Sequence, residues 1–507
     1  MIYRLSWLVL LCILFGCKSK IAELEECPNI VVFLVDDMGL MDTSVPFLTD
    51  SNGLPKKEAL NDYYRTPNME RLAKQGIRFS NFYAHSVCSP SRIALLTGQN
   101  SARHRATNYI DPKFNNKGKY GPAEWNWSGP DANALTLPKL LQQAGYKTIH
   151  IGKAHFGPVA SYAENPINLG FDVNIGGNSF GRPGSYYGED GYGHINGARN
   201  RAVPGLKKYH GTDTFLTEAL TLEAKAEITK AKSEGKPFFL HMAHYAVHAP
   251  FQSDPRFAAN YKTSGKSEKA KAYATLVEGM DKSLGDIINH IKDLGLGKNT
   301  LVLFIGDNGS DAPIKKENGY SSSAPLKGKK AMCWEGGVRV PFIAAWLDQS
   351  HESSWQKEYQ IVPNSIQQQI GKITDIFPTI CNIAGARIPK HHIIDGDDLK
   401  IQLGGQINAN RSLTFLNHFP HKHRSSYFTS LIKGDWKIIY HYPIDNKDFY
   451  ELFDLENDPF ETDNLAKDNT SKLYEMALEL QNELRKKEAL HPEITGEVIN
   501  IRLPFKE

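Results

Sequence analysis

The 507-residue sequence has no excess of charge of either sign, because 59 lysines and arginines nearly balance 56 aspartates and glutamates. The net charge is +3, and charged residues make up 23% of the chain. A nucleic-acid-binding protein needs a concentrated basic field, and a disordered acidic tail needs the opposite imbalance. Neither is expected here, and the composition is that of an ordinary soluble globular protein.

Cysteine is scarce and scattered, which argues against a disulfide framework. Besides two cysteines near the N-terminus and Cys88, the sequence contains Cys27, Cys333 and Cys381, which we interpret as small buried or half-buried hydrophobic residues. Internal repeats and low-complexity tracts are also missing. The length therefore favours one large domain with a smaller one appended, rather than three or more domains.

Long apolar runs are missing except near the N-terminus, where the run from Leu5 to Phe15 has the length of a signal peptide and is too short to span a membrane. Leu14-Phe15-Gly16-Cys17 resembles a bacterial lipobox. We therefore expect residues 1–17 to be a lipoprotein-type signal peptide, with a lipid on Cys17 attaching the protein to a membrane. Simple secretion is the alternative, because Phe15 replaces the usual small residue. The expected location is the periplasm or the outer membrane of a Gram-negative bacterium.

Apolar runs rich in β-branched residues predict the strands of a buried, mostly parallel sheet. The runs cover residues 29–35, 147–152, 238–243 and 301–305, and helices are predicted over 67–76, 137–145 and 269–294. Strands that alternate with helices predict an α/β fold with helices on both faces of the sheet. Residues 157–209, rich in glycine, tyrosine and asparagine, predict a long loop region.

The pattern changes after about residue 405, where short alternating segments appear at 427–432 and 436–440. A helix is predicted from about 471 to 487. We therefore predict a large α/β domain over residues 28–405 and a small antiparallel-sheet subdomain over residues 406–507.

Polar side chains follow each predicted strand at its carboxyl end, which is where α/β sheets bind ligands. These are Asp36 and Asp37, Lys153 and His155, His248, and Asp307 with Asn308. Asp36, Asp37, Asp307 and Asn308 offer only hard oxygen ligands, which favour Ca²⁺, or less strongly Mg²⁺, over zinc.

The segment Cys88-Ser89-Pro90-Ser91-Arg92-Ile93-Ala94-Leu95-Leu96-Thr97-Gly98 places a cysteine at the start of a predicted helix, where Pro90 suits the first turn. The helix N-terminus favours an anion beside residue 88. The order of Cys, Pro, Ser and Arg before Leu-Thr-Gly resembles the activation motif of the type I sulfatases. These enzymes belong to the alkaline phosphatase superfamily and include bacterial polysaccharide sulfatases. The resemblance implies the α/β fold of that superfamily.

The resemblance also implies that Cys88 is oxidised to formylglycine (3-oxoalanine) by a formylglycine-generating enzyme, which would read Pro90 and Arg92. One hydroxyl of the aldehyde hydrate attacks sulfur and expels the alcohol. The second hydroxyl then lets the carbonyl re-form and eject sulfate. The family's metal pairs correspond to Asp36-Asp37 and Asp307-Asn308, and residue 88 joins them as a ligand through its hydrate oxygen.

Three further segments resemble parts of the family that surround the sulfate group. Lys153 would hold sulfate oxygens, and His155 would accept a proton from the aldehyde hydrate. His248, which precedes Ala-Pro, would protonate or hydrogen-bond the departing oxygen, whereas His241 and His244 are interpreted as structural.

The second sulfate-binding lysine is assigned as Lys330 by counting back five residues from Glu335. Lys329, where the family often has glycine, is the alternative. Together with Arg92, these residues complete the predicted catalytic set.

The expected function is an exported sulfuric ester hydrolase acting on sulfated oligo- or polysaccharides, such as algal ulvan or glycosaminoglycans. A phosphodiesterase or phosphonate hydrolase of the same superfamily is one alternative, although such sites call for extra His and Asp ligands. A non-catalytic glycan-binding relative that keeps Cys88 as a thiol is another. Candidates for the substrate rim are residues 178–196, 103–105 and 418–424. The histidines at 391–392 and 421–423 lack companion ligands at zinc spacing, and we interpret them as surface or rim residues.

Overall fold

The computed structural model describes residues 27–314, 322–350, 353–444 and 449–504. The predicted signal peptide, with Cys17, lies outside the described residues. Within these described ranges, no helix has both the length and the apolar character needed to cross a membrane.

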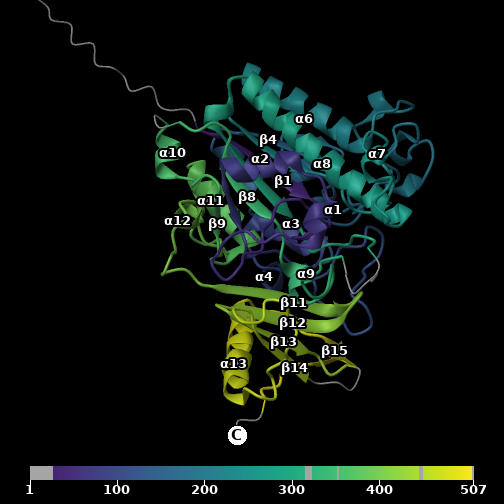
Figure 1. Cartoon of the computed structure of the whole chain (residues 1–507). Coiled ribbons are helices and arrows are strands. Elements are labelled where there is room, and N and C mark those ends of the chain that lie inside the picture. Colours follow the sequence, from purple (N-terminus) through teal and green to yellow (C-terminus); the bar gives the residue numbers. More distant parts are fainter. Residues whose placement is uncertain (1–26, 315–321, 351–352, 445–448, 505–507) are drawn as a thin grey trace, which may run out of the picture.

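An eight-stranded sheet forms the centre of the larger domain (Figure 1). The strands lie in the order β5 (Val173–Ile175), β4 (Lys147–Gly152), β6 (Phe238–Ala243), β1 (Asn29–Val35), β7 (Thr300–Gly306), β8 (Phe342–Trp346), β2 (Ile77–Phe79) and β9 (Ser365–Gln367). The pairs are parallel except those of β8, which runs antiparallel to β7 and β2. The predicted mostly parallel sheet is confirmed, and β1, β4, β6 and β7 are its four predicted strands.

Helices cover both faces of this sheet, and β1 shows why its sequence is apolar throughout. Val31, Phe33 and Val35 face a core shared with α2 (Pro67–Gln75), α6 (Leu216–Ser233) and α8 (Glu268–Asp293). The alternate residues Ile30, Val32 and Leu34 face a core shared with α3 (Cys88–Thr97), α5 (Leu137–Gln143) and α11 (Ile376–Ile383). Each such side chain contributes roughly 1.5–3 kcal/mol when fully buried. A strand buried on both faces has no polar side to alternate with.

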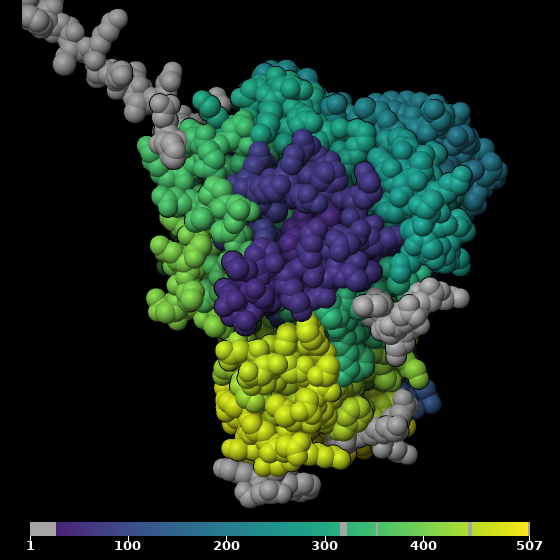
Figure 2. All heavy atoms as spheres, in the orientation of Figure 1, coloured from purple at the N-terminus to yellow at the C-terminus, as the bar shows by residue number. Residues whose placement is uncertain are grey.

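The C-terminal part is a four-stranded antiparallel sheet of β11 (Thr414–Lys422), β12 (Ser426–Lys433), β13 (Trp436–His441) and β14 (Phe449–Asp454). One face packs against α13 (Thr470–Lys486), for example through Leu431 and Leu480. The other face meets Val87, Ala331 and Cys333 of the larger domain. Figure 2 shows this part as a yellow lobe beneath the α/β body. The small sheet therefore packs against the residues next to Cys88 and Lys330, which lie at the carboxyl edge of the large sheet.

The region 157–209 is mostly irregular, as predicted, but it is firmly packed and contains the unpredicted strand β5 and several short 3₁₀ turns. Tyr186 and Tyr192 are fully buried. The Tyr186 hydroxyl lies 2.8 Å from the carbonyl oxygens of both Tyr245 and His248. The loop therefore fixes the backbone that carries His248.

Candidate active site

The carboxyl ends of β1 and β7 bring the predicted metal-binding residues together. Asp37 follows β1, and its backbone N–H donates to Asp307 Oδ1 at 3.0 Å. Ligand atoms of Asp36, Asp37, Cys88 and Asp307 all lie within 4.8 Å of one another. Among the described residues this is the one cluster of at least three acidic, cysteine or histidine side chains that could hold a metal ion. Side chains 271 residues apart in sequence therefore share one site.

Cys88 is the first residue of α3 and is buried between these carboxylates. Its Sγ lies 3.5 Å from Asp36 Oδ1 and 3.8 Å from Asp37 Oδ1. Burial raises the pKa of the Cys88 thiol to about 12, more than the nearby lysines lower it. An unmodified thiol here therefore stays protonated at neutral pH, and a protonated thiol is a weak nucleophile.

Arg92 lies one turn further along α3 and ties three strand ends to the helix. Its Nε donates to Asp307 Oδ2 at 2.8 Å, and its Nη1 donates to the carbonyl oxygen of Lys153 at 2.9 Å. Its Nη2 is 3.6 Å from Asp36 Oδ1. Burial alone would lower the pKa of Arg92, but the two aspartates raise it. The predicted catalytic residue Arg92 thus contacts the predicted metal-binding residues and aligns Cys88 with them.

Two lysines from separate segments each contact one aspartate of the pair Asp36-Asp37. Lys153 Nζ lies 2.6 Å from Asp36 Oδ2, and Lys330 Nζ lies 2.5 Å from Asp37 Oδ1. Burial alone would lower the pKa of Lys330, but Asp37 and its neighbours raise it above the usual range. Lys330 lines the active-site pocket, whereas Lys153 is fully buried against Asp36 and is not among the lining residues. Lys330, the residue assigned by counting back from Glu335, thus lies beside Asp37.

His155 lines the pocket as a neutral imidazole with one free nitrogen. Its Nε2 lies 2.8 Å from the carbonyl oxygen of Ile110, so this nitrogen carries the proton and donates. The buried Nδ1 has no hydrogen-bond partner among the described residues. Burial, with the charge of Lys153, lowers the pKa of His155 well below its usual range. Its Nδ1 is therefore unprotonated and keeps its lone pair free.

His248 approaches Asp37 from the other side. Its Nδ1 donates to the Ala249 carbonyl oxygen at 2.8 Å, which leaves Nε2 facing Asp37 Oδ2 at 3.4 Å. Burial lowers the pKa of His248 to about 3, although Asp37 opposes this shift. For the carboxylate of Asp37, burial alone would raise the pKa. The neighbouring His248 and Lys330 instead hold this pKa well below its usual range. Asp37 is therefore ionised, as a metal-binding carboxylate needs to be.

The donor set of this cluster fits a hard divalent cation. The buried oxygens Asp37 Oδ2 and Asn308 Oδ1 have no hydrogen-bond partner among the described residues. Asn308 is held in place because its Nδ2 donates to Asp37 Oδ1 at 2.9 Å and to the Gly309 carbonyl oxygen at 3.0 Å. Free carboxylate and amide oxygens in a buried, negatively charged cluster are the ligands that Ca²⁺ and Mg²⁺ prefer.

The backbone after β7 packs closely against the backbone of the segment that carries Lys330. A Cβ atom at Gly309 would lie 2.1 Å from the Gly336 carbonyl oxygen, so no other residue fits without displacement. The Lys330 backbone N–H also donates to the Ser310 carbonyl oxygen at 3.0 Å. The end of β7 therefore holds the segment that carries Lys330.

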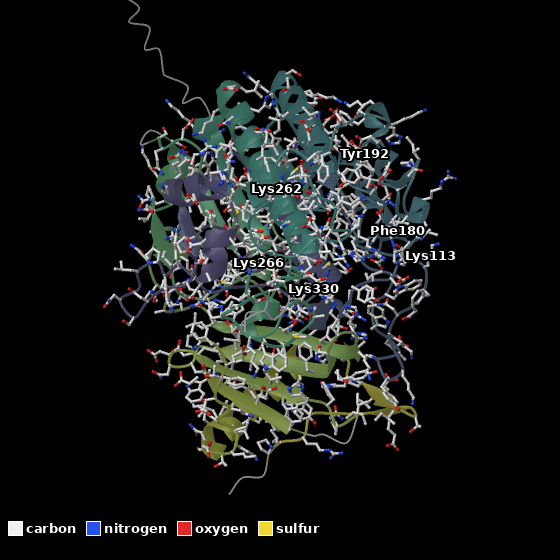
Figure 3. The ribbon with its side chains drawn as sticks, turned by 45° about the vertical axis from the view of Figure 1, so that its right-hand side comes forward. Lys113, Phe180, Tyr192, Lys262, Lys266 and Lys330 are labelled. Atoms are coloured by element: carbon white, nitrogen blue, oxygen red, sulfur yellow. The ribbon has the colours of Figure 1, made fainter. Side chains whose placement is uncertain are left out.

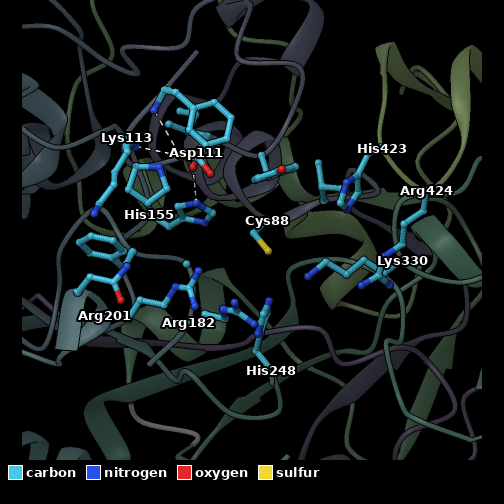
Figure 4. A pocket seen from close by; sticks show the side chains of 18 residues that line it. Cys88, Asp111, Lys113, His155, Arg182, Arg201, His248, Lys330, His423 and Arg424 are labelled. Atoms are coloured by element: carbon cyan, nitrogen blue, oxygen red, sulfur yellow. Dashed lines mark hydrogen bonds between the residues drawn. The ribbon is translucent and has the colours of Figure 1, made fainter. Parts of the chain in front are cut away.

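The cluster opens into a pocket of about 450 Å³ (Figure 4). Cys88, His155, His248 and Lys330 line it, together with Phe180 and Arg182 from the predicted rim 178–196 and His423 and Arg424 from the predicted rim 418–424. Sequence reasoning missed other lining residues, namely Tyr109, Lys113, Phe114, Asn200 and Arg201. They lie in loops without periodicity, so no local signal could identify them.

Some predicted rim residues do not reach this pocket. Arg103 instead pairs with Asp395 at 2.8 Å. His418 and His421 are buried, which corrects the interpretation of His421 as a surface or rim residue. Its Nε2 lies 2.8 Å from the Thr107 hydroxyl, so a polar partner within the fold satisfies it.

His391 and His392 line a different pocket. As predicted, His241 and His244 bond within the core, to His150 and Ser283 at 2.9 Å each.

Comparisons with known proteins agree with this geometry. Residues 28–386 match the family model Sulfatase, and residues 329–489 match the model N-sulphoglucosamine sulphohydrolase, C-terminal. The chain is 32% identical over 408 residues to mouse N-acetylgalactosamine-6-sulfatase, covering 77% of this chain and 69% of the relative. It is 26% identical to N-acetylgalactosamine-6-O-sulfatase of Bacteroides thetaiotaomicron, covering 92% of this chain and 95% of the relative.

The crystal structure of Ps i-CgsB in complex with k-i-k-neocarrahexaose has a similar fold. It aligns with a TM-score of 0.70 at 24% identity and covers 90% of this chain and 93% of its own. With a family model that spans most of the larger domain, the chain belongs to the sulfatase family and is an enzyme that hydrolyses sulfate esters.

Proposed function

We propose that this sulfatase removes sulfate groups from sulfated oligo- or polysaccharides, using a formylglycine at position 88 and Ca²⁺. The observation that carries the proposal is the open pocket lined by Cys88 and Lys330, with Lys153 buried against Asp36 beside it. The pocket has a rim of aromatic and basic side chains. A pocket of this size has room for a sugar beyond the sulfate group. The relatives named as N-acetylgalactosamine-6-sulfatases support a hexosamine sulfate as a substrate.

The side chains suggest how each step is assisted. Lys153 and Lys330 would hold the sulfate oxygens beside residue 88, and the N-terminus of α3 would add to the positive potential there. Ca²⁺, when bound by Asp36, Asp37, Asp307 and Asn308, would supply Lewis acidity. His155 Nδ1 is available to accept a proton from the nucleophile. His248 Nε2 faces Asp37 at the pocket, and it would protonate or hydrogen-bond the departing oxygen once the negative charge of the bound sulfate ester raises the pKa of His248.

A phosphodiesterase or phosphonate hydrolase is less consistent with this site. The cluster offers one set of acidic ligands and two lysines, without the additional His and Asp ligands of a second metal. A single metal with paired lysines suits one sulfate group. Comparing the turnover of an aryl sulfate with that of the matching aryl phosphate separates the two activities.

The substrate class is tested by measuring sulfate release from defined oligosaccharides. We expect sulfated N-acetylgalactosamine from chondroitin to be cleaved first, and we include ulvan fragments because algal polysaccharide was the expectation from the sequence. Turnover confined to small aryl sulfates would contradict the carbohydrate proposal. We also propose export to the periplasm or outer membrane through the signal peptide over 1–17. Labelling with a radioactive fatty acid, with and without Cys17→Ser, distinguishes lipidation from secretion.

Calcium should stabilise the folded protein. A ligand that binds only the folded state adds about 2.7 kcal/mol at a concentration 100 times its Kd. We expect Ca²⁺ to raise the melting temperature after chelation, and Asp307→Asn together with Asn308→Ala to remove most of this increase. Asp62→Asn, at an exposed carboxylate, is the matched control and should keep the increase. An equal increase in the double variant would contradict the assigned ligands.

A further inference from the structure

The mouth of the active-site pocket carries an unbalanced positive charge on one side. Figure 4 shows Lys113, Arg182 and Arg201 on one side of Cys88, opposite Lys330 and Arg424. We call the first three residues the basic wall. Arg424 is neutralised by Asp311, whose Oδ2 accepts from Nη2 at 2.7 Å. The basic wall takes part in none of the ion pairs found among the described residues, so its charges remain available to a ligand.

No carboxylate of the pocket lining compensates the basic wall. Asp111 is the one acidic residue among the described residues that line the pocket. Its Oδ1 accepts from the backbone N–H groups of Lys113 and Phe114, at 2.9 and 3.3 Å, and so caps its own turn. Asp111 therefore serves the local backbone rather than the arginines.

Arg182 and Arg201 are close enough to repel each other. Burial lowers the pKa of Arg182, and the charge of Arg201 lowers it further. Two guanidinium groups held together without a counterion are stabilised when an anion enters between them. Their planar forks also suit the paired oxygens of a carboxylate or sulfate.

Two phenylalanines flank the basic wall. Phe180 precedes Gly181 and Arg182 in the pocket lining, and Phe114, 60% exposed, follows Lys113. Figure 3 shows Phe180 and Lys113 at the same edge of the larger domain. A large exposed aromatic side chain beside a pocket is typical of a ligand-contact surface. Aromatic faces next to cations match a sugar ring that carries an anionic group.

We propose that Lys113, Arg182 and Arg201 form a second anion subsite, which binds a carboxylate or a second sulfate on the same oligosaccharide as the sulfate that is removed. This inference rests on the proposed carbohydrate function. It predicts a preference for glycans with at least two negative charges, and it assigns specificity to loops outside the sulfate-binding centre.

The test compares substrates that differ only in the second anion. One pair is a monosulfated disaccharide with a uronate carboxylate and its carboxyl-reduced form. The other pair consists of a disaccharide without a carboxylate that carries one sulfate and the same disaccharide with two sulfates. Arg182→Ala with Arg201→Ala should lower the preference, measured as the ratio of kcat/KM for dianion over monoanion, by roughly 10- to 100-fold. The pair whose ratio collapses identifies the anion.

Two controls separate charge from shape and position. Arg182→Lys with Arg201→Lys should keep part of the preference, because it keeps the charge but loses the planar fork. Arg199→Ala removes an exposed arginine from the same loop, outside the pocket lining, and should keep the full ratio.

An unchanged ratio in the double alanine variant, with oligosaccharides still cleaved, would overturn the subsite alone. A wild-type enzyme that turns over aryl sulfate but none of the oligosaccharides would overturn the proposed function and the subsite with it.

Discussion

Cys88→Ala is expected to abolish sulfate-ester turnover while the fold stays intact. The substitution removes the thiol that a formylglycine-generating enzyme would oxidise, so under the proposed mechanism no aldehyde forms, and loss of a covalent nucleophile lowers kcat by about 10⁴-fold or more. Alanine suits the first turn of α3, and the methyl group occupies the space of a small buried side chain. The measurement is kcat for an aryl sulfate and for a sulfated oligosaccharide, with circular dichroism as the check on folding.

Cys381→Ala is the matched control, because Cys381 is another buried helical cysteine in α11 and lies outside the active-site pocket. It should keep full activity. Peptide mass spectrometry over residues 81 to 103 should find the aldehyde at position 88 in active wild-type enzyme, and its amount should rise with co-expression of a formylglycine-generating enzyme. An active preparation in which every copy of this peptide carries an unmodified thiol would contradict the mechanism.

The sequence predicted the centre of the site well because its residues follow strands that can be recognised locally. A strand buried on both faces is an uninterrupted apolar run, as β1 and β7 are, and parallel strands end at one edge of the sheet. The sequence therefore predicts that the side chains after these two strands lie together, namely Asp36, Asp37, Asp307 and Asn308. The family motif around Cys88 added the predicted nucleophile, and the contacts of Arg92 show why an arginine belongs one turn after it.

The rest of the site depends on contacts between segments that carry no periodic signal. Arg182 and Arg201 lie in the irregular region 157–209, whose path is set by buried tyrosines such as Tyr186 rather than by a repeating pattern. The short strand β2 and the antiparallel β8 were missed for a related reason. Three residues of β2 are too few for a pattern, and strand direction depends on the whole sheet.

A buried ion cluster between the two domains is a further feature that the sequence could not predict. The side chain of Lys437 on β13 is fully buried. Its Nζ lies 2.9 Å from Glu335 Oε1 and 2.8 Å from Glu461 Oε1. Glu335 also accepts from the Tyr83 hydroxyl at 2.9 Å. Because Glu335 ends the segment that carries Lys330, the C-terminal sheet anchors the segment of this proposed sulfate-binding lysine through the cluster.

Lys437→Met should lower the free energy of unfolding by about 3–5 kcal/mol, because it removes the buried cation beside Glu461 and leaves Glu335 with the more distant Arg339, at 3.6 Å. Methionine keeps the volume of the side chain, so the loss measures charge rather than packing. Lys433→Met is the control. Lys433, on the neighbouring strand β12, pairs with Glu479 at 2.8 Å at the surface, and an exposed pair contributes at most about 1 kcal/mol.

Urea unfolding followed by fluorescence compares the two variants. Adding Glu461→Gln to Lys437→Met should recover part of the loss, since it removes the buried carboxylate that has lost its cation. Equal effects of the two lysine substitutions would show that the buried cluster does not hold the domains together. If it does, Lys437→Met should also lower kcat/KM for an aryl sulfate at temperatures where the variant is still folded, because Lys330 loses its anchor.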